Sequence, residues 1–273
     1  MHALLDDPMV QSAVAPFLVA LIVGAALQRT RLAWFAIAAA FATAVGLATG
    51  IGFTPMSASR KLLLLVLLAP FVGLVLDRLP TPQRGIVPEL GALCGAASIW
   101  VFWSVLSQRE MAQMLPQAAG VAVFVGLMVA LTLRLRHDGA AGGAATVALG
   151  LAVGVAALLS ASIGNFANGL AIAAGGGALL LLQFVLNRGL APGVIGMLTT
   201  GLAAALFAAA TFMLAQLPWY AMALLLPVPL AAGLKLAARH SRRVRMAAAT
   251  LISLAASTAP IFAAWLAARA ATS

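Results

Sequence analysis

The chain has 273 residues, of which 64% are hydrophobic and only 8% are charged, with a formal net charge of +10. Soluble domains carry about 25% charged residues, so this composition excludes a globular protein with a water-covered surface. The bases lie at the ends of apolar runs, where membrane topology accounts for them, and we expect no nucleic-acid partner.

Apolar runs of about 20 residues, each long enough to cross a hydrocarbon core of about 30 Å, follow one another along the chain. They do not alternate with a period of two, which favours helices over barrel strands. We therefore predict an all-α, polytopic integral membrane helix bundle of about ten transmembrane helices, with residues 1–273 forming a single transmembrane domain and no soluble domain. The predicted spans are 10–28, 32–52, 61–79, 87–107, 115–135, 143–162, 169–187, 191–215, 218–237 and 246–269.

Lysine and arginine are distributed unevenly between the two sides of this bundle. Four bases lie on one side, namely Arg60, Lys61, Arg109 and Arg269. Twelve lie in the connections after the odd-numbered spans: Arg29, Arg31, Arg78, Arg84, Arg134, Arg136, Arg188, Lys235, Arg239, Arg242, Arg243 and Arg245. The positive-inside rule then predicts a bacterial inner-membrane protein with these connections in the cytoplasm and both termini in the periplasm.

Glu89, near the start of the fourth span, is the acid that we place closest to the membrane. It follows Pro88, and a proline and an acid in the first turn are typical of an ordinary helix start. The other interpretation is a carboxylate that lines a polar cavity.

No charged residue occurs from Gly139 to Asn187, and the middle of this run, around Ser160, Ser162, Asn165 and Asn168, is polar. Asn and Gly are strong turn formers, so a turn that reaches the outer surface is one interpretation. The other is that the serine and asparagine side chains face inward and offer neutral hydrogen-bonding groups to a ligand.

The seventh span contains three consecutive glycines, Gly175 to Gly177, and small residues at Gly169, Ala173 and Gly177 share one face. Such a seam lets another helix approach closely. An unwound segment that binds substrate through its backbone is the alternative. Prolines 70, 227, 229 and 260 interrupt the third, ninth and tenth spans, either as ordinary membrane-helix kinks or as gating hinges.

The basic stretch ARHSRRVR before the tenth span is an expected contact for anionic lipid headgroups, through Arg239, Arg242, Arg243 and Arg245. We find no paired carboxylates, no histidine-rich metal spacing and no phosphate-binding glycine loop. We therefore expect neither enzymatic activity nor a cofactor.

The function favoured by these features is a small permease-like carrier of a neutral or amphiphilic substrate. Five spans in each half are compatible with a 5+5 inverted repeat, as in many carriers. The alternative is a non-catalytic subunit or assembly factor of a larger membrane complex, with a membrane-protein partner or a second copy of the chain. The predicted substrate-binding residues are Glu89, Ser162, Asn165, Asn168, Thr199, Thr200 and Ser257.

Overall fold

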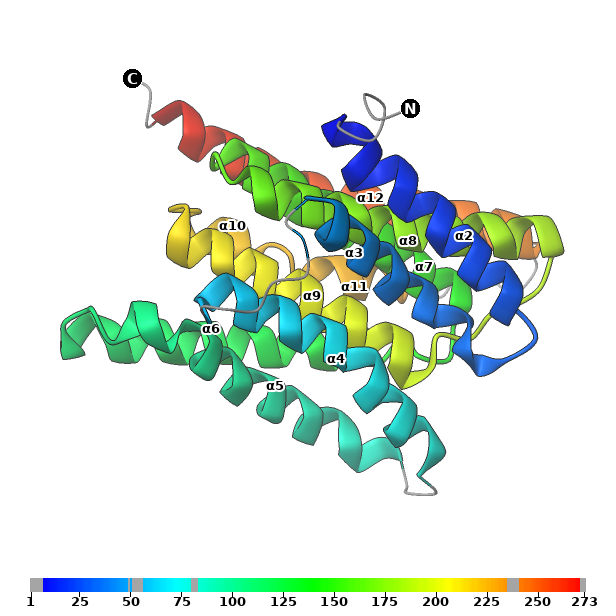
Figure 1. The fold of residues 1–273 in the computed structure, drawn as a ribbon, viewed down its shortest axis with the longest axis horizontal. Coiled ribbons are helices and arrows are strands. Elements are labelled where there is room, and N and C mark those ends of the chain that lie inside the picture. Colours follow the sequence, from blue (N-terminus) through cyan, green and yellow to red (C-terminus); the bar gives the residue numbers. More distant parts are fainter. Residues whose placement is uncertain (1–6, 49, 51–55, 80–82, 235–240, 271–273) are drawn as a thin grey trace.

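The computed structural model describes residues 7–48, 50, 56–79, 83–234 and 241–270, and within these ranges it contains helices and no strands (Figure 1). Eight helices of the described chain are long and apolar enough to cross a membrane. The first is Val10–Leu27, a π-helical turn η1 (Val10–Val14) that continues as α2 (Ala15–Leu27). The others are α4 (Ala58–Arg78), α5 (Gln83–Leu106), α6 (Met111–Leu133), α7 (Gly139–Leu159), α8 (Ile163–Leu186), α9 (Gly193–Leu214) and α12 (Arg242–Ala270).

Within the described residues, two of the ten predicted spans form helices shorter than a full crossing. The second is a 3-10 turn η2 (Arg31–Trp34) followed by α3 (Phe35–Ala48). The ninth is broken into α10 (Trp219–Ala223) and α11 (Pro227–Ala232). Pro227 and Pro229 have no backbone N–H to continue the helix, so the chain passes through a turn before α11 begins. The prediction of membrane-spanning helices is thus confirmed, whereas the count of ten full spans is not.

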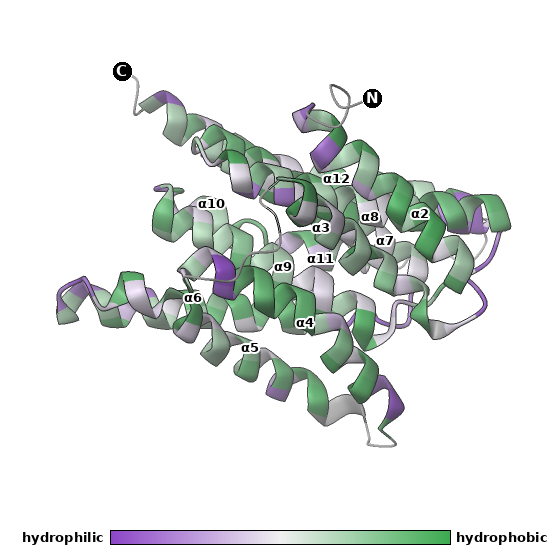
Figure 2. Cartoon of the chain, viewed as in Figure 1, coloured by the Kyte–Doolittle hydropathy of each residue, from purple (hydrophilic) through white to green (hydrophobic). Residues whose placement is uncertain are grey.

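Helix α9 lies at the centre of the bundle, and α3, α4, α6, α7 and α8 all pack against it (Figure 1). Of its most apolar window, 94% is buried inside the protein, against 22% for the Val10–Leu27 helix. Since α9 is apolar on all sides, a central position buries its whole circumference. The outer helices instead expose large apolar side chains, including Ile22, Val75, Leu93 and Leu251, on a surface that suits hydrocarbon (Figure 2).

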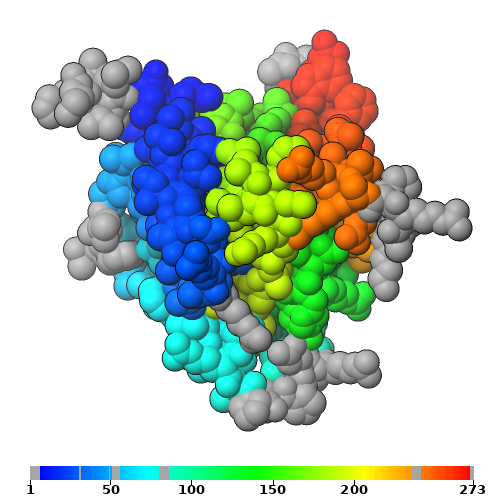
Figure 3. Space-filling model, turned by 90° about the vertical axis from the view of Figure 1, so that its right-hand side faces the viewer, coloured from blue at the N-terminus to red at the C-terminus, as the bar shows by residue number. Residues whose placement is uncertain are grey.

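The arginine-rich connections gather at one end of the bundle, which we call the basic end. It comprises Gln28–Thr30, Arg134–Asp138, Asn187–Pro192 and the first turns of α12. Figure 3 shows this end, with the end of α8 beside the beginning of α12. The opposite end, which we call the far end, carries the connections Ser107–Glu110, Ser160–Ser162 and Ala215–Pro218. The chain therefore alternates between the two ends as predicted.

The small-residue face of the seventh span packs tightly on α7. A Cβ atom on Gly169 would lie 2.6 Å from the Cα of Gly154, and one on Gly150 would lie 2.5 Å from the backbone nitrogen of Ala173. Gly177, the third member of the predicted seam, has only Phe17 nearby, at 3.9 Å. Helix α8 is continuous from Ile163 to Leu186, so the glycines serve close helix packing, and no unwound segment is seen here.

The irregular helices do not occupy equivalent positions in the two halves of the chain. In the first half the short helix is the second element, α3, whereas in the second half the broken helix is the fourth, α10–α11. The 5+5 inverted repeat therefore stays a prediction.

Candidate binding pocket

The predicted polar residues of the sixth-to-seventh turn lie at the far end. Ser162 immediately precedes α8, while Asn165 and Asn168 lie within its first two turns rather than in a loop. Asn165 donates a hydrogen bond from Nδ2 to Oγ1 of Thr211, at 3.1 Å, and so ties α8 to the end of α9. The turn itself is Ser160–Ser162, with Ala161 in the left-handed region at a φ of 57°.

Two of the predicted substrate residues, Thr199 and Thr200, are completely buried near the beginning of α9. Thr199 donates from Oγ1 to the carbonyl of Ile195 at 2.7 Å, and the Thr200 and Thr146 hydroxyls lie 3.0 Å apart. Buried hydroxyls with such partners need no ligand to satisfy them. They act here as links within and between helices.

The remaining two predicted residues lie elsewhere. Ser257 is buried in the middle of α12 and donates to the carbonyl of Leu254 at 2.7 Å. Glu89 is exposed on α5, several residues after the helix begins at Gln83, so it is not a first-turn acid. The seven predicted residues thus do not converge on one cavity, and their role in substrate binding stays a prediction.

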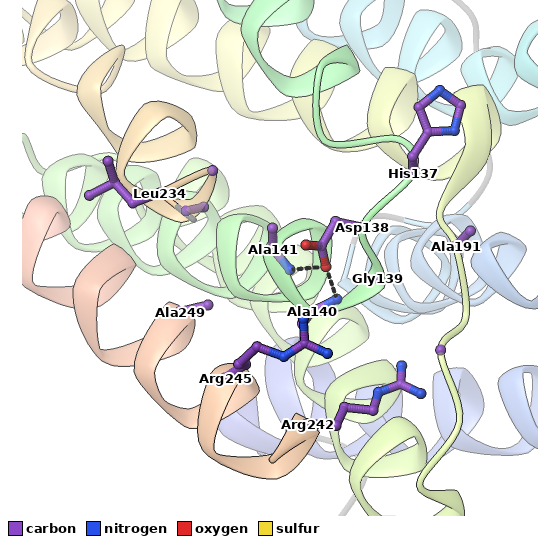
Figure 4. Close-up of a pocket in the computed structure, with 13 residues that line it drawn as sticks. His137, Asp138, Gly139, Ala140, Ala141, Ala191, Leu234, Arg242, Arg245 and Ala249 are labelled. Atoms are coloured by element: carbon purple, nitrogen blue, oxygen red, sulfur yellow. Dashed lines mark hydrogen bonds between the residues drawn. The ribbon is translucent and has the colours of Figure 1, made fainter. Parts of the chain in front are cut away.

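A pocket of about 570 Å³ opens at the basic end, where four parts of the chain meet (Figure 4). These are the beginning of α7, the α8–α9 connection, the end of α11 and the first turns of α12. Alanine and glycine line most of its wall, together with Leu234, and charged side chains stand at its rim. The lining residues are His137, Asp138, Gly139, Ala140, Ala141, Gly189, Ala191, Ala232, Gly233, Leu234, Arg242, Arg245 and Ala249.

Arg242 and Arg245 supply the positive charge of this pocket. The Arg242 side chain is half-buried, and its Nη1 donates to the carbonyl of Asn187 at 3.4 Å. Its guanidinium lies directly against Gly189, since a Cβ there would be 2.6 Å from Nη2. Arg245, one turn further along α12, is exposed, and Figure 4 shows its guanidinium extending toward Asp138 and Ala140.

Asp138 is the acid of the pocket, and its carboxylate caps α7. Oδ1 accepts hydrogen bonds from the backbone amides of Ala140 at 2.9 Å and Ala141 at 3.1 Å. A carboxylate at a helix N-terminus satisfies free amides and the helix dipole. His137 is exposed, and its ring points away from the two arginines in Figure 4.

A buried polar network fixes the α8–α9 connection beside the pocket. Gln183 donates from Nε2 to the carbonyl of Gly139 at 3.2 Å and accepts from the amide of Leu190 at 3.5 Å. The indole Nε1 of Trp34 donates to the carbonyl of Leu190 at 3.0 Å. Hydrogen bonds from η2, α7 and α8 therefore hold the α8–α9 connection, and with it this wall of the pocket, in place.

The basic stretch divides between pocket and surface. Arg242 and Arg245 line the pocket, whereas the guanidinium of Arg243 lies over the Phe184 ring, 5.0 Å from its centroid. Arg239 lies outside the described residues.

A sequence signal for Asp138 was present, since an aspartate directly before a glycine- and alanine-rich run is a typical helix cap. The pocket-lining residues Gly189 and Ala232 carry no such signal, and they were not identified from the sequence.

Asp77 was also missed from the sequence. It lies in the last turn of α4, where a negative charge opposes the dipole of its own helix. Its two carboxylate oxygens instead accept hydrogen bonds from the amides of Val194 and Ile195, at 3.0 to 3.3 Å, and so cap α9.

The pocket can supply positive charge, hydrogen-bond donors and a partly apolar wall. Within the part of the chain that the structure describes, no three His, Cys, Asp or Glu side chains come together as metal ligands. The two arginines make the pocket suited to holding a ligand with an anionic group. No protein-family model, curated protein or solved structure matches the chain.

Proposed function

We propose that the protein is a small permease-like carrier of an amphiphilic substrate, and that the pocket at the basic end is its substrate site. The observation that carries this proposal is the pocket itself, of about 570 Å³, with arginines at its rim and alanines along its wall. Small-molecule sites combine an apolar lining with a few placed polar groups in this way.

The broken helix α10–α11 supports the same proposal. Its last residue, Ala232, lines the pocket together with Gly233 and Leu234, which follow it. Many carriers place their substrate site beside interrupted helices, since non-helical backbone at membrane depth is tolerated only where it is buried or lines a cavity. A break next to the pocket also provides a place where the wall can move.

The proposed setting is a bacterial inner membrane with the basic end in the cytoplasm and both termini outside. The support is the excess of arginine and lysine in the connections at that end. In this orientation the pocket opens to the cytoplasm, on the leaflet side where anionic lipids attract basic residues.

The experiment is a flux measurement with the full chain reconstituted in vesicles, against a panel of labelled amphiphiles and neutral solutes. A pocket-filling variant, Ala191→Trp, is compared with Ala247→Trp. Ala191 is an exposed residue of the pocket lining, and Ala247 is an exposed residue of α12 outside it. We expect flux in the wild type and in Ala247→Trp, and loss of flux in Ala191→Trp.

Flux no greater than that of empty vesicles for the whole panel would remove the carrier proposal. Equal flux in both tryptophan variants would place the substrate path elsewhere. Both variants must first elute as single species with wild-type helicity, so that a loss reflects the blocked pocket and not misfolding.

The second candidate function is a non-catalytic subunit or assembly factor. It is favoured by the tightly filled centre of the bundle, where the rings of Phe41 and Phe207 lie 5.6 Å apart and Met128 is fully buried. A filled interior suits a protein that moves no substrate. Purification in mild detergent followed by mass spectrometry tests this candidate, which predicts a stoichiometric membrane-protein partner or a stable homo-oligomer.

A further inference from the structure

The two pocket arginines are placed as a pair by the geometry of α12. Residues three apart on a helix lie on the same face, so Arg242 and Arg245 both reach the pocket. Arg243 lies between them in sequence, but its guanidinium lies over Phe184 instead. The pairing is therefore a property of this helix face rather than of a generally basic segment.

Most hydrogen-bonding capacity of this pair is available to a ligand. A guanidinium carries five N–H donors, and Arg242 uses one of them on the carbonyl of Asn187. Among the described residues, Arg245 makes no side-chain hydrogen bond or ion pair. The one carboxylate of the pocket, Asp138, already accepts two bonds from the beginning of α7.

The charges that face the pocket leave it positive. Arg242 and Arg245 stand against the single carboxylate of Asp138, and His137 is the remaining titratable group of the lining. Two positive charges that face the same pocket repel one another, and an anion between them relieves that repulsion. An anionic ligand is therefore favoured over a neutral or cationic one.

We propose that Arg242 and Arg245 bind the phosphate group of a phosphate ester, whose organic part lies along the alanine wall of the pocket. A phosphate monoester carries a charge of about −1.5 to −2 and three acceptor oxygens arranged tetrahedrally, so it can engage two guanidinium groups at once, whereas a carboxylate offers a single charge and two oxygens in one plane. The volume of about 570 Å³ far exceeds the roughly 30 Å³ that one water molecule occupies, so the pocket has room for much more than the phosphate itself. This inference rests on the proposed function, since it names the substrate class of the same pocket.

The source of the phosphate is either a membrane lipid or a soluble ester, and the test includes one arm for each. In the first arm, which tests a soluble ester, the purified full chain in phosphate-free detergent is titrated with glycerol phosphate. In the second, the chain in phosphatidylcholine nanodiscs containing long-chain phosphatidic acid is analysed by native mass spectrometry for retained lipid. Hexanoate serves as the carboxylate probe.

The pocket variant carries both Arg242→Gln and Arg245→Gln. The matched control carries both Arg188→Gln and Arg243→Gln, and it removes the same amount of charge. Arg188 and Arg243 are exposed and do not line the pocket. Since the pocket variant loses the charge-assisted hydrogen bonds to the phosphate, we expect at least a tenfold weaker binding, which corresponds to about 1.4 kcal/mol. The control should stay within about twofold of the wild type, and hexanoate should bind far more weakly than either phosphate probe.

Phosphate-ester binding in either arm that depends on the pocket pair supports the inference, and the arm in which it occurs identifies the source. Equal weakening in the two variant pairs, hexanoate binding as tight as phosphate, or no phosphate binding in either arm would overturn it. Pocket-dependent binding without flux would remove the carrier function and leave this site standing. Flux that does not depend on the arginine pair would leave the carrier function standing and remove this site as its substrate site.

Discussion

The carboxylate of Asp77 accepts a hydrogen bond of 3.0 Å from the backbone amide of Val194, and so joins the end of α4 to the beginning of α9. Gly193, just before this amide, has a φ of 62°, and a Cβ there would lie 2.5 Å from Oδ2 of Asp77. The central helix of the bundle is therefore capped by a side chain more than 100 residues away in the sequence.

Replacing Asp77 by alanine should destabilise the protein by about 1–2 kcal/mol, because the first amides of α9 lose their acceptor and its helix dipole loses a negative charge. Asp77→Asn should cost less, since the amide oxygen still accepts. Unfolding in mixed micelles, followed by circular dichroism, measures the difference. Glu89→Ala, at an exposed acid of α5, is the control and should change stability by less than about 0.5 kcal/mol.

The seam between α7 and α8 predicts opposite outcomes for two glycines of one helix. Gly169→Ala places a methyl group 2.6 Å from the backbone of Gly154 and should destabilise the protein by about 1–3 kcal/mol. Gly177→Ala meets only Phe17, at 3.9 Å, and should be neutral or stabilising, because alanine favours the helix by about 1 kcal/mol. Thermal unfolding of the pair in the same detergent distinguishes them, and equal losses would mean that this seam is packed differently.

Thr200→Val tests whether a buried threonine of α9 takes part in substrate binding. The bond to Thr146 disappears, and we expect a loss of stability of about 1 kcal/mol. Flux of any substrate found in the vesicle panel should stay within about twofold of the wild type, since Thr200 does not line the described pocket. A large loss of flux with unchanged stability would instead return Thr200 to the substrate site.

Asp138→Asn should strengthen binding of the phosphate ester. Asparagine is as good a helix cap as aspartate, so α7 keeps its first hydrogen bonds while the pocket loses its negative charge. At an effective dielectric constant near 20, two unit charges about 12 Å apart interact by about 1.4 kcal/mol, so removing one such repulsion corresponds to roughly a tenfold gain. Calorimetric titration at low and high salt checks this, and the gain should shrink as salt screens the charges.

Cysteine labelling tests the proposed orientation. Cysteines introduced at Ser160 and Arg188, which lie at opposite ends of the bundle, should react with an impermeant reagent from the periplasm and from the cytoplasm respectively. Cys94 is buried in α5, and Cys94→Ser provides the background variant. Reaction of both sites from the same side would contradict the alternation of the helices, and a reversed pattern would contradict the arginine rule.

Helix existence was predictable because an apolar run of 20 residues has few alternatives in a bilayer, where every backbone group needs an internal partner. Helix ends were less predictable, because side-chain caps extend them beyond the apolar run: Asp138 starts α7 four residues earlier than predicted. Asn165, expected in a turn, lies inside α8, and its amide bonds to Thr211 of another helix. Local propensity gives no information about such a distant partner.

The pocket was not predictable for a related reason. Asp138, Gly189 and Arg242 are about 50 residues apart from one to the next, and they meet only because α7 and α12 begin, and α8 ends, at the basic end of the bundle. The sequence identified Arg242 and Arg245 as bases near lipid headgroups. The hydrophobic pattern, however, contains nothing that separates them from Arg243, whose side chain lies outside the pocket.

The break between α10 and α11 has a consequence for the surrounding bilayer. Within the described residues, the apolar segment Trp219–Ala232 would span about 21 Å if it were helical throughout at 1.5 Å per residue, which is shorter than the roughly 30 Å of a hydrocarbon core. Large apolar side chains on it, such as Trp219 and Leu230, are exposed on the outside of the protein. A short apolar wall draws the lipid surface inward, so the leaflets should be thinnest along this flank. A molecule with a polar head and an oily tail would there have the shortest distance to travel between the two leaflets.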